Sequence, residues 1–147
     1  MNIINILKNK LNNKINTKDI EGYGFQNFRF RVKFKDTESK NQFLDYLNNN
    51  KNEGIIYIIR LGTLTHTIEY KNILKIFDFN NYLFIYFSEI KRYQPSDTIP
   101  YELNLKNISE IKRMINYDSE KYNIDSNLLI SIYKKEREKY GYIEEFL

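Results

Sequence analysis

The sequence predicts a single α+β domain over residues 1–147, built on an antiparallel or mixed sheet of about five strands. An N-terminal helix, one inserted helix and two C-terminal helices complete the expected layout. Three observations lead to this prediction: unbroken apolar–basic alternation over residues 28–35, strand-like runs that cluster between residues 55 and 87, and two helical patterns that follow them. Strands that follow one another closely along the chain favour antiparallel pairing rather than helical crossovers.

The first quarter of the chain predicts a helix and then a strand. Apolar residues recur at every fourth position over residues 2–15, the spacing of one helix face: Ile3, Leu7, Leu11 and Ile15. Gly22 and Gly24 indicate a loop after this helix, and the alternating strand follows over residues 26–35.

Residues 36–49 read as the inserted helix, because Asp36 is a suitable N-cap and Phe43, Leu44 and Leu47 form an apolar stripe. Four strands are then expected, at residues 55–61, 64–70, 73–79 and 82–87. The turn Asn80-Asn81 joins the last two, since Asn tolerates the positive φ of tight hairpins. Continuous apolar runs predict that the first and the last of the four are central strands.

The last third of the chain predicts mainly helices. Residues 88–100 contain both prolines and read as a surface loop, and residues 101–105 could add an edge strand. Residues 107–117 carry an apolar helical stripe, and Asp125 is the expected N-cap of a final helix.

Charge is distributed unevenly along the chain. The net charge is +4, but residues 1–35 hold eight Lys or Arg and two acids, whereas the remaining 112 residues sum to −2. A partner recognised by charge should therefore contact the first quarter of the chain.

The alternating strand separates two kinds of side chain. Successive side chains of a strand point to opposite faces, so Phe28, Phe30, Val32 and Phe34 are expected in the core. The opposite face would carry a row of cations turned outward, and with the lysines of the first helix it forms the predicted partner-binding surface: Arg29, Arg31, Lys33, Lys35, Lys8, Lys10 and Lys14. The alternative is an exposed edge strand whose charges prevent aggregation.

Catalytic and metal-binding constellations are sparse. The chain has no cysteine and a single histidine, His66, whose apolar neighbours favour a packed or rim position over a catalytic one. Asp118, Glu120 and Asp125 lack the pattern of a calcium loop and indicate a solvated helix-capping region. We therefore expect no enzyme, metal or cofactor, although catalysis by carboxylates alone stays open.

Two stretches resemble parts of known families. Residues 121–136 resemble the opening helix of bacterial lytic transglycosylases, with Glu136 at the position of the catalytic glutamate, but Arg137 stands where that family has serine. Residues 22–25 and 32–36 resemble a base-stacking strand of RNA-recognition motifs, which exposes its aromatics. Here an insertion separates the two pieces, and alternation assigns the intervening phenylalanines to the core.

Composition gives the context of the functional hypotheses. Asn, Ile, Lys, Tyr and Phe are abundant and alanine is absent, as in AT-rich genomes. The first hypothesis is a non-enzymatic protein of a phage or mobile element that inhibits a larger host machine, as anti-CRISPR and toxin-immunity proteins do, by binding a protein or ribonucleoprotein. The second is direct RNA or DNA binding through the basic quarter. No apolar run reaches the ~18 residues of a membrane span, so a cytoplasmic location and no membrane partner are expected. The oligomeric state stays open.

Overall fold

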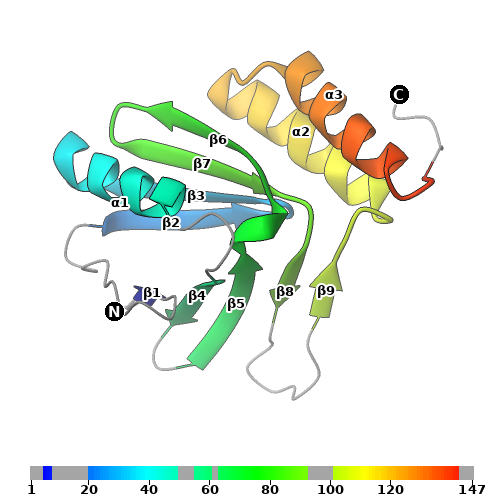
Figure 1. The fold of residues 1–147 in the computed structure, drawn as a ribbon. Helices are drawn as coiled ribbons and strands as arrows, with labels where there is room; N and C mark the ends of the chain where they lie inside the picture. The colour runs from blue at the N-terminus through cyan, green and yellow to red at the C-terminus, as the bar shows by residue number, and fades with distance from the viewer. Residues whose placement is uncertain (1–4, 8–19, 50–54, 61–62, 93–100, 143–147) are drawn as a thin grey trace.

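The structure, a computed structural model, describes residues 5–7, 20–49, 55–60, 63–92 and 101–142. Within these ranges three α-helices accompany nine strands, which form one five-stranded and one four-stranded antiparallel sheet (Figure 1). The predicted α+β class is confirmed. None of the described helices combines the length and the apolar character needed to cross a membrane.

The four-stranded sheet has the order β2-β3-β7-β6 and positions the candidate site. Its strands are β2 (Ile20–Gln26), β3 (Arg29–Phe34), β6 (Ile73–Phe79) and β7 (Tyr82–Phe87). Asn27 and Asn80 adopt φ values of 52° and 50° in the two hairpin turns, as the sequence predicts for the second turn. β7 lies between β3 and β6, which confirms its predicted central place.

The loop expected around Gly22 and Gly24 is instead strand β2, and that prediction is wrong. β2 is an edge strand that pairs with β3 and is irregular between Ile20 and Gly22. Gly24 has a packing role in it, because a Cβ there would lie 3.2 Å from Nη2 of Arg31. Glycine in this strand therefore makes room for a cation rather than ending the strand.

The five-stranded sheet has the order β1-β4-β5-β8-β9. Its strands are β1 (Asn5–Leu7), β4 (Ile55–Arg60), β5 (Thr63–Glu69), β8 (Ile90–Arg92) and β9 (Tyr101–Leu103). β4 lies inside the sheet and β9 at its edge, as predicted. β8 occupies part of the stretch expected as a loop, and it pairs with both β5 and β9.

The predicted helix over residues 2–15 is wrong at Asn5–Leu7, because these residues form β1 and pair with β4. The stretch whose apolar spacing indicated a helix is short, and its asparagines have a low helix propensity. Pairing with the otherwise unpaired edge of β4 outweighs this weak local preference. The remaining residues of the predicted helix lie outside the described ones.

The inserted helix α1 (Thr37–Asn49) covers the core face of the four-stranded sheet. Asp36 caps it as predicted, with Oδ1 accepting a hydrogen bond from the Ser39 amide at 2.7 Å. Phe43 is buried and lies 5.4 Å, ring to ring, from Phe34. The alternation of β3 is confirmed, because Phe30, Val32 and Phe34 are each 0% exposed. Phe28 lies in the turn before β3, is equally buried and contacts the ring of Tyr133.

The helices α2 (Ile108–Tyr122) and α3 (Ser126–Glu138) pack against each other and lie beside the four-stranded sheet (Figure 1). α2 extends beyond the predicted residue 117 and ends at Asn123, whose φ of 54° is the left-handed conformation that terminates helices. Asp125 caps α3 as predicted. The hydroxyl of Tyr133 donates to the Phe87 carbonyl at 2.9 Å and joins α3 to the end of β7.

Candidate functional site

The face of the four-stranded sheet opposite to the core carries cations and aromatic rings in register. Residues paired across antiparallel strands point to the same side of the sheet, so β3, β7 and β6 arrange these side chains in rows. The first row is Arg29 with Tyr86, the second is Arg31 with Phe84 and Phe77, and the third is Lys33 with Tyr82 and Phe79.

The first row is buried under α2. Arg29 is 2% exposed and makes a bidentate ion pair with Asp118, Nε to Oδ2 at 3.0 Å and Nη2 to Oδ1 at 2.8 Å. The prediction that Arg29 faces outward is therefore wrong, and so is the prediction that Asp118 is solvated. Strand alternation correctly separates the two faces of β3, but it does not reveal that a helix covers one end of the second face.

Tyr86 completes this buried network. Its hydroxyl donates to Oδ2 of Asp118 at 2.6 Å. Burial, and next the hydrogen bond to Asp118, raise the pKa of Tyr86 far above its ordinary value, so the hydroxyl keeps its proton and remains a donor. The Arg29 guanidinium also lies 5.6 Å from the ring centroids of both Phe84 and Tyr122. These contacts fix α2 on the sheet.

Lys75, which pairs with Tyr86 on the edge strand β6, is exposed, but among the other members exposure increases from the first row to the third. Phe84 in the second row is 3% exposed, whereas Phe79 in the third row is 42% exposed. Arg31 and Lys33, two of the predicted site residues, are partly buried and lie on this opening side of the sheet. The cover provided by α2 thus ends near the second row.

The open part of this face continues onto the last turns of α2, where Tyr117 is 37% exposed and Lys121 is exposed. We call this surface the aromatic–basic face. It consists of Arg31, Lys33, Phe77, Phe79, Tyr82, Tyr117, Lys121 and Tyr122.

Two cations of the aromatic–basic face lie near the same ring, that of Tyr122. The Arg31 guanidinium and the Lys121 ammonium each lie 5.8 Å from the ring centroid of Tyr122. Arg31 Nε is buried and has no hydrogen-bond partner. Within the described part of the chain, no carboxylate forms an ion pair with either cation. The two positive charges are therefore not neutralised by a carboxylate within the described part of the chain.

Lys121 is held in its charged form. Its Nζ donates to the Tyr117 hydroxyl at 3.1 Å, and this hydrogen bond is the main cause that raises the pKa of Lys121 above its ordinary value. The nearby charge of Arg31 acts in the opposite direction. Lys121 therefore carries its positive charge at neutral pH beside a second cation.

The other predicted site residues are not part of this face as the structure describes it. Lys35 is exposed at the bend that follows β3. Lys8, Lys10 and Lys14 lie outside the described residues. Of the predicted site residues, the structure thus places Arg31 and Lys33 on this face, whereas Arg29 is buried under α2.

Sequence reasoning missed the aromatic members of the face. One signal was present, since the predicted hairpin at Asn80-Asn81 places Phe79 opposite Tyr82. The contribution of α2 had no comparable signal, because residues 117–122 are far in sequence from β3. Only the packing of α2 on the sheet brings Lys121 close to Arg31.

The structure also shows the surroundings of His66 and of the predicted acidic cluster, here Glu120 and Asp125. The His66 ring stacks on Phe25 with centroids 4.0 Å apart and an interplanar angle of 15°, which agrees with the packed position expected. Asp125 accepts from two amides at the start of α3, and Glu120 is exposed. Among the described residues, no group of three or more His, Asp or Glu side chains gathers as metal ligands would.

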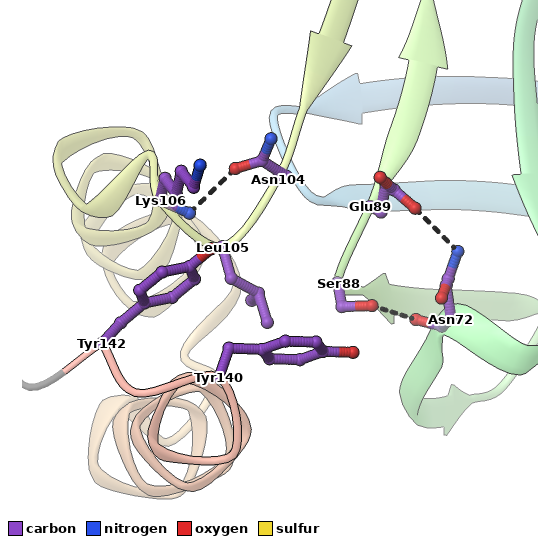
Figure 2. Close-up of a pocket in the computed structure, with 8 residues that line it drawn as sticks. All are labelled: Asn72, Ser88, Glu89, Asn104, Leu105, Lys106, Tyr140 and Tyr142. Carbon is purple, nitrogen blue, oxygen red and sulfur yellow. Dashed lines mark hydrogen bonds between the residues drawn. The ribbon is translucent and has the colours of Figure 1, made fainter.

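A hollow lies between the sheets and the end of α3 (Figure 2). This hollow of about 290 Å³ is small beside the ~300–1,000 Å³ of most ligand pockets. Its polar groups partly pair with one another: Ser88 donates to the Asn72 carbonyl, and the Asn72 amide donates to Glu89 at 3.4 Å. Tyr140 projects from the α3 side and is 63% exposed. We therefore give the aromatic–basic face more weight.

Comparisons with protein-family models, curated proteins and solved structures found no match.

Proposed function

We propose that this protein is a non-enzymatic nucleic-acid-binding protein that contacts phosphate groups through the aromatic–basic face. The observation that carries the proposal is that Arg31 and Lys121 both lie beside the Tyr122 ring without a carboxylate partner in the described residues. The charge of Arg31 disfavours the charged form of Lys121, and a nearby anion would offset this repulsion. A phosphate group supplies that anion, and its binding releases counterions from the nucleic acid.

The aromatic rings favour a nucleic acid over an acidic protein surface as the source of the anion. A carboxylate-rich surface would satisfy the cations but leave Phe79 and Tyr117 without a partner, whereas nucleic acids place flat bases beside every phosphate. Inhibition of a larger host machine by docking on a protein remains the alternative prediction. The cytoplasmic location expected from the sequence belongs to the same proposal.

The salt dependence of binding tests the proposal quantitatively. With three phosphate contacts, by Arg31, Lys33 and Lys121, and a slope of about −0.7 per contact on a single strand, affinity should fall roughly 20-fold from about 50 to about 200 mM salt. The variant Lys121→Gln should reduce this fall to roughly 7-fold, and Arg31→Gln/Lys121→Gln to roughly 3-fold. Fluorescence anisotropy with a labelled oligonucleotide measures each value.

The control is Lys134→Gln, which removes the same charge from an exposed position on α3. It should keep the salt dependence of the wild type. Circular dichroism confirms that each variant is folded. If no oligonucleotide binds at either salt concentration, or if the control changes the slope as much as Lys121→Gln does, the proposed function is wrong and docking on a protein is the surviving hypothesis.

A further inference from the structure

We infer that the aromatic–basic face takes single-stranded rather than double-stranded nucleic acid, with unpaired bases stacked on Phe79 and Tyr117. This inference rests on the proposed function and names the form of the nucleic acid. It depends on the two exposed rings that share this face with Arg31 and Lys121.

The two exposed rings come from different elements, and contacts through Phe84 and Tyr122 connect them. On the sheet side, Phe79 of β6 is 42% exposed, and its ring is nearly parallel to that of Phe77, with an angle of 5° and centroids 6.1 Å apart. On the helix side, Tyr117 is 37% exposed and accepts the hydrogen bond from Lys121. A single strand that spans the face from β6 to α2 would place bases on both rings and phosphates near the cations.

The rings are held in place by buried neighbours. Phe79 contacts the ring of Phe84 edge to face at 5.5 Å, and Phe84 contacts Tyr122 in the same way at 4.9 Å. Tyr122 in turn lies 6.4 Å from Tyr117. One continuous aromatic cluster thus connects the two exposed rings, so less side-chain freedom is lost when a base stacks on either ring.

Exposed rings discriminate between the two forms of nucleic acid. In a duplex each base is already stacked and paired, and a flat protein face meets mainly the phosphate backbone. Arg31 and Lys121 can contact that backbone in either form, whereas Phe79 and Tyr117 gain a partner only when bases are unpaired. The cations therefore supply affinity for any nucleic acid, and the rings supply the preference for single strands.

The test compares a labelled single strand of about 15 nucleotides with the duplex of the same sequence, at one salt concentration, as DNA and as RNA. The wild type should bind the single strand more tightly. Phe79→Ala should weaken single-strand binding roughly 5- to 150-fold, which corresponds to the ~1–3 kcal/mol of one stacked base, and leave duplex binding unchanged. Tyr117→Leu should act in the same direction.

The matched control is Tyr140→Ala, which removes an even more exposed ring next to the hollow of Figure 2. It should leave both affinities unchanged. Equal binding of duplex and single strand by the wild type, or an equal loss for both forms in Phe79→Ala, would overturn the inference while the proposed function stands. If none of the four probes binds, the proposed function itself is wrong.

Discussion

The buried ion pair between Arg29 and Asp118 should be the most sensitive single contact for stability. Arg29→Met keeps a long side chain but leaves the Asp118 carboxylate, itself 0% exposed, without its cation. Removing one member of a buried pair costs about 3–5 kcal/mol, a large part of the ~5–15 kcal/mol that stabilises a typical domain. For a chain of 147 residues this lowers the thermal midpoint by roughly 6–20 °C.

Urea unfolding followed by circular dichroism suits this measurement, because the chain has no tryptophan to report by fluorescence. The double variant Arg29→Met/Asp118→Leu removes both charges, so its stability should return to within about 2 kcal/mol of the wild type. The Tyr86 hydroxyl, which loses its acceptor in the double variant, accounts for part of the remaining loss. A cost below about 1 kcal/mol for Arg29→Met, or a double variant as unstable as the sum of the singles, would refute the reasoning.

Two further predictions concern the helices. The hydrogen bond from the Ser39 amide lowers the pKa of Asp36 below its ordinary value of 3.8. This cap therefore stabilises α1 fully at pH values above 3.8, and the stabilisation is lost as the pH falls through the lowered pKa of the folded state. The difference in thermal midpoint between the wild type and Asp36→Ala should therefore shrink below that pH, and a constant difference down to about pH 2 would contradict the assignment. Tyr133→Phe leaves the buried Phe87 carbonyl without its 2.9 Å donor and should cost about 1–3 kcal/mol in urea unfolding, whereas a loss below about 0.5 kcal/mol would show that the hydroxyl is dispensable.

The sequence predicted best those elements whose patterns are local. Alternation over residues 28–35 correctly placed four apolar side chains in the core, and Asp36, Asp125 and Asn80-Asn81 marked two helix starts and a hairpin. Each of these signals depends on residues that are neighbours along the chain. They therefore needed no knowledge of how distant segments pack.

The errors arose where distant segments decide the outcome. Asn5–Leu7 form a strand because β4 offers a partner about 50 residues further along the chain, and no local pattern announces this pairing. Arg29 lies 89 positions from Asp118, so alternation alone treated it as an outward cation like Arg31. The candidate site was thus half predicted, since two of its cations were named and its rings and its helix were not.

The rows on the four-stranded sheet have a consequence for how this protein can change. Arg29, which fastens α2, and Arg31, which reaches open surface, are two positions apart on β3. Lys121 lies about one turn beyond Asp118 on α2. The buried pair of Arg29 and Asp118 thereby holds β3 and α2, and with them Arg31 and Lys121, in a fixed relative position. Substitutions at Lys33 or Phe79 should therefore change the surface with less effect on folding than substitutions at Arg29, which would disturb both the fold and the position of the outer cations.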